Sequence, residues 1–276
     1  MGRTIACANQ KGGVGKTTTV VNLASLLALA GERILIIDLD PQGNATSGLG
    51  IDRASLGRST YDALIDGVDL RALVVDGTSE GVDVIPSTLA LAGAEVELAG
   101  VPGRERRLRQ RIDALADDYD LIMIDCPPSL GLLTINALTA ADSVLIPLQC
   151  EYYALEGLTQ LLATIDLVRE HLNPRLAIDG IVLTMADGRT NLSTEVEAEA
   201  RLHLGTTVYE TVIPRSVRLS EAPSHGRSIA SYAPLSRGGI AYAALATEFR
   251  ARNARRVSER LVGIPIVRDH DLAVLS

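Results

Sequence analysis

The sequence predicts an α/β fold in which a mostly parallel, twisted sheet carries helices on both faces. Short apolar runs alternate with longer segments of helical periodicity, which is typical of βαβ units. The 276 residues are 47% hydrophobic, enough to bury a substantial core. No internal repeat or low-complexity linker interrupts the series. We therefore expect one domain over residues 1–252, followed by a C-terminal tail of unknown role over residues 253–276.

The expected strands are short runs that are apolar almost throughout, as in parallel strands buried on both faces. In chain order they are Thr4–Ala8, Arg33–Leu39, Val82–Pro86, Leu121–Asp125, Ser143–Leu148, Ala177–Thr184 and Val208–Ile213.

The expected helices are the longer segments in which apolar residues recur at helical spacing. They are Thr17–Ala30, Arg104–Ala116, Leu132–Ala140, Leu155–His171, Ser193–Leu204 and a last helix from about Gly238 to Arg252. Residues 41–81 are rich in Gly, Asp, Ser and Thr, so we expect a loop region there with one short helix near Thr60–Ile65.

Composition excludes several classes of protein. The formal charge of −8 and the pI of about 5.1 argue against a constitutively basic nucleic-acid binder, so any DNA binding must be local or switched. No apolar run is long enough for a membrane-spanning helix, and the first residues lack the apolar stretch of a secretory signal, so we expect a cytoplasmic protein. Cys7, Cys126 and Cys150 are too widely spaced for a disulfide scaffold or a metal site.

A glycine-rich string, NQKGGVGKTTT at Asn9–Thr19, follows the first expected strand and leads into a helix. This context is that of a phosphate-binding loop, in which glycines let backbone N–H groups approach a phosphate at a helix N-terminus. Lys16 would reach the β- and γ-phosphates, and the Thr17 hydroxyl would coordinate Mg²⁺. The expected nucleotide-binding residues of this loop are Lys11, Gly12, Gly13, Val14, Gly15, Lys16, Thr17 and Thr18. The expected fold is thus P-loop NTPase-like.

The loop departs from the usual GxxxxGK[ST] pattern, because Gln10 stands where the first glycine should be and a second lysine, Lys11, follows it. This string resembles the deviant Walker A motif of the ParA/MinD family of P-loop ATPases, in particular its chromosome-partitioning, Soj-like branch. The resemblance covers about residues 1–250. It is carried also by the strings Asp38–Gly50, Ile124–Leu138, Gln149–Leu158 and Val212–Gly226.

The resemblance implies ATP and Mg²⁺ as cofactors and a homodimer that forms with ATP. In this family the lysine corresponding to Lys11 reaches the nucleotide of the partner chain across an ATP-sandwich interface. The resemblance also implies nonspecific binding to double-stranded DNA and a ParB-like centromere-binding protein that stimulates hydrolysis through a basic N-terminal segment.

Carboxylates end two of the expected strands, where ligands of open parallel sheets bind. Asp125 follows four apolar residues and resembles the Walker B aspartate that holds Mg²⁺. Either Asp38 or Asp40 could position the attacking water, and spacing alone does not decide between them, because both point to the same side of a strand. The family string DxDPQGN implies Asp40. The expected catalytic residues are Lys11, Lys16 and Asp40, and the expected metal-binding residues are Thr17, Asp40 and Asp125.

Later segments are expected to complete the site. Met185, Pro214 and Arg215 correspond to family positions around the adenine, although ordinary loop packing is an equal explanation for Met185. Arg189 and Arg218 match positions that contact DNA from the dimer surface. The cluster Arg104–Arg111 is interleaved with acidic residues and is better explained as a solvated helix face. The tail cluster Arg250–Arg260 is a further alternative.

The function expected from these residues is that of an ATP-dependent chromosome or plasmid partitioning ATPase, located in the cytoplasm on the nucleoid. The alternative is a MinD-like, membrane-associated positioning ATPase, which needs a C-terminal amphipathic helix with large apolar residues. The sequence offers charge without apolar area at Arg250–Arg260, and Pro265 interrupts the apolar string LVGIPIV, so we expect no stable membrane association. An iron-protein reductase would need a cluster-binding pair of cysteines, which this sequence does not offer. A small-molecule ligase would not require the partitioning-type strings.

Overall fold

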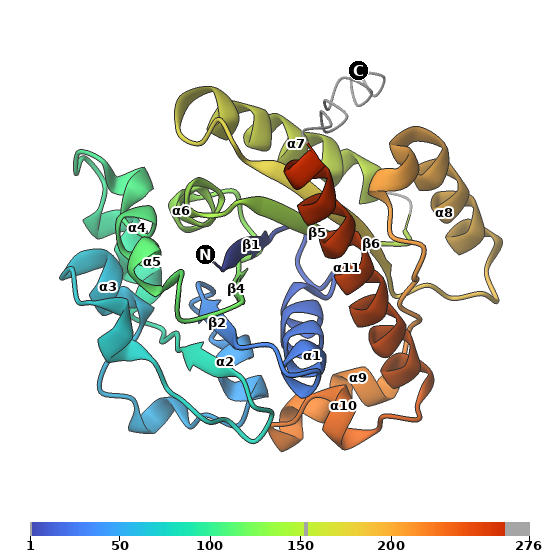
Figure 1. The fold of residues 1–276 in the computed structure, drawn as a ribbon, viewed down its shortest axis with the longest axis horizontal. Coiled ribbons are helices and arrows are strands. Elements are labelled where there is room, and N and C mark those ends of the chain that lie inside the picture. Colours follow the sequence, from blue (N-terminus) through green and yellow to red (C-terminus); the bar gives the residue numbers. More distant parts are fainter. Residues whose placement is uncertain (1, 152–153, 263–276) are drawn as a thin grey trace.

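The computed structural model describes residues 2–151 and 154–262 of the chain. Residues 152–153, within the string Gln149–Leu158, and residues 263–276 of the expected tail lie outside the described part. A six-stranded sheet with the order β3-β2-β4-β1-β5-β6 runs through the centre, and every pair of neighbouring strands is parallel (Figure 1). Its strands are β1 (Arg3–Cys7), β2 (Ile34–Asp38), β3 (Asp83–Ile85), β4 (Leu121–Asp125), β5 (Ser143–Gln149) and β6 (Ala177–Thr184).

Helices cover both faces of this sheet, as predicted (Figure 1). Successive residues of a strand point to opposite faces, and Ile37 and Ile36 accordingly belong to two different hydrophobic clusters. One cluster includes residues of α3 (Thr60–Ile65), α4 (Leu91–Glu97), α5 (Arg109–Ile112), α6 (Leu132–Ala140), α7 (Ala154–His171) and α8 (Asn191–Leu204). The other includes residues of α1 (Lys16–Leu29), α2 (Asn44–Gly48), α9 (Val217–Glu221), α10 (Ile229–Tyr232) and α11 (Arg237–Val262).

The sheet register places the chemistry-bearing residues at one edge. β4 lies between β1 and β2, so Asp125 is paired in register with Cys7 on one side and with Asp38 on the other. The phosphate loop follows β1 directly, and the Asp40 loop follows β2 directly. The carboxyl ends of these strands therefore bring together segments that are far apart in the sequence, as is usual for ligand sites in parallel sheets.

The continuous helix predicted over Arg104–Ala116 is wrong. The segment forms a 3₁₀ turn at Arg104–Arg106, the short α5, and a second 3₁₀ turn at Asp113–Leu115. Asn136 of α6 explains the first break. Its side-chain oxygen accepts the Leu108 N–H at 3.2 Å, and its nitrogen donates to the Arg104 carbonyl at 2.9 Å, the two groups that an α-helix would bond to each other.

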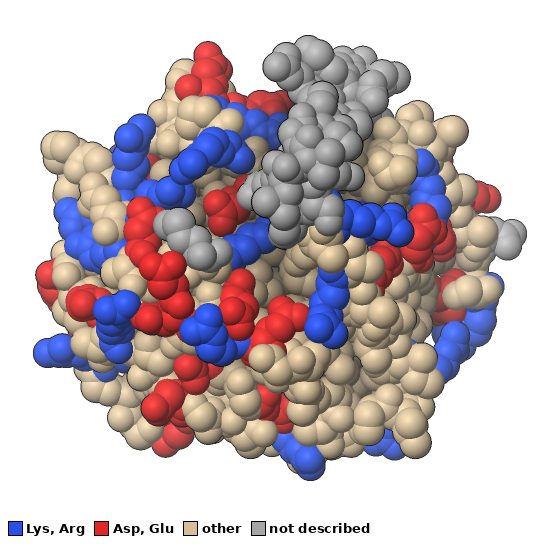
Figure 2. All heavy atoms as spheres, in the orientation of Figure 1, with Lys and Arg blue, Asp and Glu red and all other residues tan. Residues whose placement is uncertain are grey.

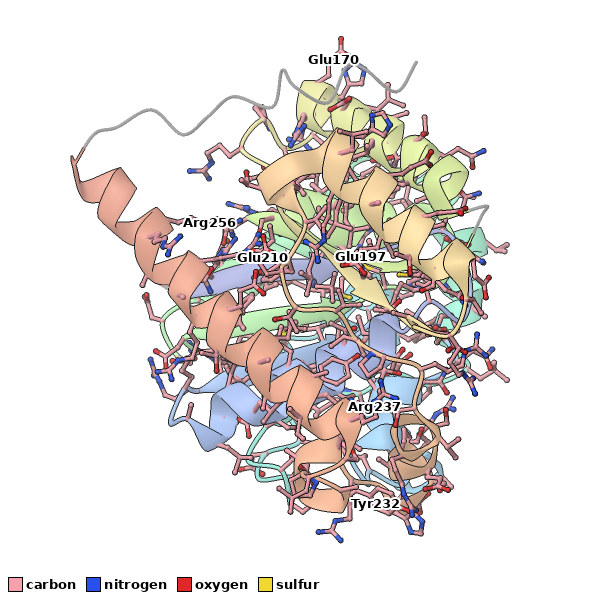
Figure 3. All side chains as sticks on the ribbon, turned by 90° about the vertical axis from the view of Figure 1, so that its right-hand side faces the viewer. Glu170, Glu197, Glu210, Tyr232, Arg237 and Arg256 are labelled. Carbon is pink, nitrogen blue, oxygen red and sulfur yellow. The ribbon has the colours of Figure 1, made fainter. Side chains whose placement is uncertain are left out.

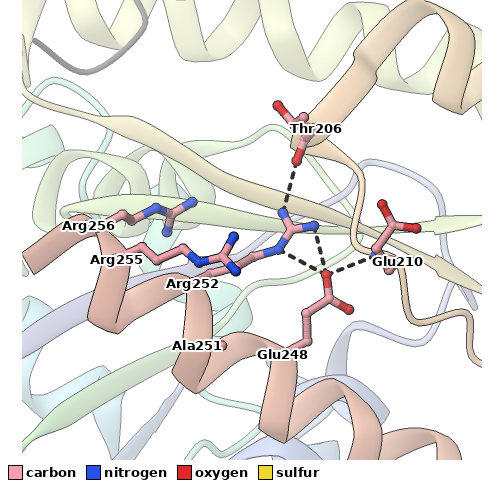
Figure 4. Close-up of a pocket in the computed structure, with 7 residues that line it drawn as sticks. All are labelled: Thr206, Glu210, Glu248, Ala251, Arg252, Arg255 and Arg256. Atoms are coloured by element: carbon pink, nitrogen blue, oxygen red, sulfur yellow. Dashed lines mark hydrogen bonds and ion pairs between the residues drawn. The ribbon is translucent and has the colours of Figure 1, made fainter. Parts of the chain in front are cut away.

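The predicted strand at Val208–Ile213 is also wrong. The N–H groups of Tyr209 and Ile213 donate to the Ile181 and Leu183 carbonyls, so four residues of this segment span only two residues of β6. Between them, the Glu248 carboxylate of α11 accepts the N–H group of Glu210 (Figure 4) and that of Thr211, each at 2.9 Å. Because α11 binds these amides, the segment bulges and forms only one isolated bridge to the sheet, between Val208 and Ile181.

The remaining differences concern lengths and small helices. The short helix Thr60–Ile65 is confirmed, with Ser59 and Asp62 forming a capping box at its start. The sequence does not predict the short helices α2, α4, α9 and α10. The last helix does not end near Arg252 but continues to Val262, across the expected domain boundary. Arg237 lies near its beginning and Arg256 towards its other end (Figure 3). Among the described residues, no helix is both long and apolar enough to cross a bilayer.

Candidate functional site

The phosphate loop is held in a fixed shape by two side chains, those of Asn9 and Thr184. Gly13 and Gly15 have φ values of 75° and 88°, a left-handed conformation that favours glycine. Asn9 accepts the Lys11 N–H at 3.0 Å and donates to the Pro147 carbonyl of β5 at 2.7 Å. Thr184, at the end of β6, donates to the Val14 carbonyl at 2.9 Å. The loop is therefore shaped by the fold before any ligand arrives.

The two lysines of the loop have different environments. Lys16 is only 6% exposed, and its ammonium group donates to the Lys11 carbonyl at 3.2 Å, so its side chain lies along the inside of the loop. The Lys11 side chain is partly exposed and forms an ion pair with Glu151, with Nζ and Oε2 2.9 Å apart. The charge of Lys16 thus faces the centre of the loop, whereas the charge of Lys11 is held at its rim.

Asp125 fits the metal role. Its Oδ2 accepts the Thr17 hydroxyl at 2.7 Å, while its Oδ1 is buried and has no hydrogen-bond partner. Burial, followed by the negative charge of Asp38, raises the pKa of the Asp125 carboxyl well above its usual range. A cation at this point would give the free oxygen a partner and offset the repulsion.

A magnesium ion needs few protein ligands, because it keeps several waters and binds substrate phosphates. Among the described residues, no group of three or more His, Cys, Asp or Glu side chains is arranged to hold a metal.

The hydrogen bonds distinguish Asp38 from Asp40. Both oxygens of Asp38 are occupied, since Oδ1 accepts the Asp40 N–H and Oδ2 accepts the N–H and hydroxyl of Thr46 at 2.9 and 2.7 Å. Burial raises the pKa of Asp38 to about 6, despite these bonds. Asp40 is 6% exposed, and its Oδ1 accepts the Gln42 N–H at 2.9 Å. Asp38 therefore connects strand and loop, and Asp40 is the better candidate for positioning water.

The expected base-binding residues lie close to the phosphate loop. Met185 directly follows Thr184, the residue bonded to the loop, and has a φ of 53°, which is unusual for a residue other than glycine. Ala186 forms a parallel bridge with Pro214 and accepts the Arg215 N–H at 3.0 Å. The Arg215 guanidinium lies 3.7 Å from Glu151, the partner of Lys11. The structure thus brings all three beside the loop.

The expected DNA contacts lie on the surface and are paired with neighbouring carboxylates. Arg189 is bonded to Asp187 at 2.7 Å, and Arg218 to Glu221 at 2.8 Å. Each guanidinium charge is therefore already paired with a carboxylate of the same chain.

Three polar residues around the site were not singled out in the sequence. Glu151 binds both Lys11 and Arg215, and it also accepts from the Gln149 amide at 2.6 Å. Thr46 holds Asp38, and Thr184 holds the phosphate loop. Glu151 and Thr46 lie within family-like strings and could have been found there, but an isolated threonine such as Thr184 carries no signal in one sequence.

The chain is similar to known proteins over most of its length. A family model described as an AAA domain matches residues 2–178. The sporulation initiation inhibitor protein Soj of Bacillus subtilis (strain 168) is 58% identical over 251 residues, covering 91% of this chain and 99% of that protein. The chromosome partitioning protein ParA of Myxococcus xanthus (strain DK1622) is 52% identical over 262 residues, covering 95% of this chain and 93% of that protein.

A solved structure is also similar. The crystal structure of cobyrinic acid a,c-diamide synthase from Mycobacterium smegmatis with bound ADP and magnesium is 40% identical and has a TM-score of 0.78. The match covers 90% of this chain and 93% of that one.

Proposed function

The chain belongs to the ParA/MinD family of P-loop ATPases, and from this premise we propose that it is an ATP-dependent chromosome or plasmid partitioning ATPase. The observation that carries the proposal is the pair of lysines in one phosphate loop, one facing its centre and one held at its rim. A single lysine facing the centre suffices to bind a nucleotide. A second lysine at the rim, Lys11, supports a role outside the chain's own nucleotide site.

In this proposal ATP is bound by the loop residues 11–18, with Lys16 at the β- and γ-phosphates and with Met185, Pro214 and Arg215 around the adenine. Thr17 and Asp125 would hold Mg²⁺ with its waters, and Asp40 would be a further ligand. When bound, Mg²⁺ neutralises charge on the transferred phosphoryl group. Asp40 orients the attacking water. Proton transfer from this water to Asp40 need contribute little to the rate, because phosphoryl transfer depends mainly on positioning.

The finer steps of the cycle are also part of the proposal. ATP closes a homodimer in which Lys11 reaches the partner's nucleotide. The dimer then binds double-stranded DNA without sequence preference through Arg189 and Arg218, and hydrolysis stimulated by a ParB-like protein releases it. The protein acts in the cytoplasm, on the nucleoid. A single ATPase domain over residues 1–252 and a tail over 253–276 stay proposals, and α11 crosses that boundary.

Similarity to a cobyrinic acid a,c-diamide synthase does not change this choice. That structure is 40% identical, whereas the Soj and ParA proteins are 58% and 52% identical over nearly their whole lengths. A ligase of that kind would need no ATP-dependent DNA binding, so the two functions separate in one experiment.

The test is to size the full chain by light scattering with ADP, with ATP, and with ATP plus duplex DNA. Lys16→Ala serves as the control that cannot use nucleotide. We expect a monomer with ADP, a dimer with ATP, and DNA co-elution only with ATP. DNA binding that ignores the nucleotide, or an ATP-bound monomer that hydrolyses ATP without any response to DNA, would contradict the proposal.

A further inference from the structure

Arg53 binds the loop that carries Asp40. It lies on a 3₁₀ turn (Arg53–Ser55) that follows this loop in the chain, and its guanidinium group donates to two successive backbone carbonyls of the Asp40 loop. Nη2 donates to the Pro41 carbonyl at 3.2 Å, and Nη1 donates to the Gln42 carbonyl. These are the two residues that follow Asp40 directly.

The same two peptide groups are bound on their other side by Asp40. The peptide group joining Pro41 and Gln42 gives its oxygen to Arg53 and its N–H to the Asp40 Oδ1, at 2.9 Å. The next peptide group gives its oxygen to Arg53 and its N–H, on Gly43, to the Asp40 carbonyl at 2.8 Å. A hydrogen bond to a carbonyl oxygen polarises the peptide and strengthens the N–H as a donor, so the guanidinium charge acts on Asp40 through two peptide groups.

Gly43 shows how closely Arg53 fits the loop. Residue 43 has a φ of 60°, and a Cβ there would lie 2.5 Å from the Arg53 Nε. The Nε itself is buried and has no hydrogen-bond partner. The side chain is thus packed on the loop at the cost of one unpaired donor, which indicates that its two carbonyl contacts fix where it lies.

The turn that carries Arg53 does not need the guanidinium. Asp52 caps it by accepting the Ala54 N–H at 3.0 Å, and the Ser55 hydroxyl donates to the Asp52 carbonyl at 2.7 Å. Truncation of Arg53 is therefore expected to leave the turn and the hydrophobic clusters in place.

We propose that Arg53 is a positioning residue for ATP hydrolysis, which orients the Asp40 carboxylate by holding both peptide groups that bond to Asp40. This inference rests on the proposed catalytic role of Asp40. Without Arg53 the loop would keep its N–H bonds to Asp40 but lose the contacts that fix those peptide groups in space. Asp40 would then sample orientations in which the water is out of line, and misplacement of about 1 Å can cost on the order of 100-fold in rate.

The experiment compares Arg53→Ala, Arg53→Lys and the control Arg58→Ala, an exposed arginine five residues on, by steady-state hydrolysis in the full chain. We expect Arg53→Ala to lower kcat about tenfold, while the KM for ATP and the Kd for ADP change less than about twofold. Arg53→Lys, which keeps a cation able to reach one carbonyl, should recover part of the rate. Arg58→Ala should match wild type.

A double-mutant cycle with Asp40→Ala separates this inference from the proposed function. If Arg53 acts through Asp40, then Asp40→Ala and the Asp40→Ala, Arg53→Ala double variant should hydrolyse ATP equally slowly. A further loss in the double variant, or an unchanged kcat in Arg53→Ala, would overturn the positioning role. Wild-type turnover in Asp40→Ala would instead overturn the catalytic role of Asp40, with Asp38 as the next candidate.

Discussion

Two regions of the molecule differ in how much of each site a single chain supplies. One is the nucleotide edge, where the phosphate loop, Asp40 and Asp125 lie at the carboxyl ends of β1, β2 and β4. The other consists of the arginines expected to contact DNA. At the edge, Lys16 and Asp125 are buried, and Asp125 has an oxygen that lacks a partner within the chain. At the surface, the Arg189 side chain is 87% exposed and that of Arg218 58%, and each already has a carboxylate partner. A buried unpaired atom costs free energy until a ligand binds it, whereas an exposed paired arginine costs almost nothing.

The structure of a single chain can therefore reveal one of these two sites more fully than the other. The site for ATP is assembled by strand register within one chain, so the unpaired oxygen of Asp125 indicates where a cation would bind. A surface for DNA is expected only when two chains combine, because phosphate affinity rises with the number of contacts. On the face shown in Figure 2, basic and acidic side chains are interspersed rather than gathered into one basic patch.

Lys16→Ala should have the largest effect. Its buried ammonium is expected to bond two phosphate groups, and loss of two charged hydrogen bonds corresponds to roughly a 1,000-fold weaker Kd for ATP. Isothermal titration calorimetry with ATP and Mg²⁺ measures it. A Kd for ATP within tenfold of the wild-type value would contradict this prediction, because the buried Lys16 would then contribute no more to binding than an exposed charge.

Lys11→Ala should keep ATP binding in the monomer but raise the concentration needed for the ATP dimer roughly 100-fold. The chain contains only two lysines, Lys11 and Lys16, and only Lys11 is partly exposed. Acetylation by an amine-specific reagent, followed by peptide mass spectrometry, should therefore label Lys11 in the ADP state and protect it in the ATP dimer. Normal dimerisation of Lys11→Ala, or labelling that is the same in both states, would contradict the cross-interface role.

Much of the nucleotide edge could be predicted from the sequence, because its signals are local. The phosphate loop and the strand-ending aspartates are short strings, and apolar runs predict five of the six strands closely and the short β3 within a longer run. The failures come from side chains distant in sequence. Asn136 breaks the helix at Arg104–Ala116, and Glu248 prevents the strand at Val208–Ile213. Arg53 binds the Asp40 loop but lies outside every sequence motif, so no motif predicts this contact.

Arg189→Ala and Arg218→Ala should have intermediate effects that depend on salt. Four contacts per dimer predict a log–log salt dependence of the DNA association constant near −3.6, and either substitution should flatten it by about 1.8. Fluorescence anisotropy of labelled duplex DNA with the ATP dimer measures this slope. Arg33→Ala is the matched control, because the Arg33 side chain is also 58% exposed and paired with Asp120, but lies at the opposite end of the strands. If the double arginine variant kept the full slope, another surface, such as Arg104–Arg111 or the tail, would bind DNA.

The smallest expected effect is a pH dependence that separates the two regions without any ligand. The pKa of Asp38 is raised to about 6 by burial, above the usual value near 4, so its contribution to stability is complete below about pH 4 and is lost as the pH rises through 6. At the surface, the hydrogen bond from Arg189 lowers the pKa of Asp187, so that residue titrates below this window.

The melting temperature of the nucleotide-free chain should therefore fall between about pH 4 and 6, by roughly 2–4 °C for each kcal/mol lost. Asp38→Asn should melt lower throughout, because an amide cannot accept from all three donors that surround Asp38, but its melting temperature should change less across this window. Asp187→Asn, the surface control, should keep the wild-type slope. Differential scanning fluorimetry across the window measures all three proteins. An unchanged slope in Asp38→Asn would assign the titration to another buried acid, with Asp125 first, because burial and the charge of Asp38 raise its pKa as well.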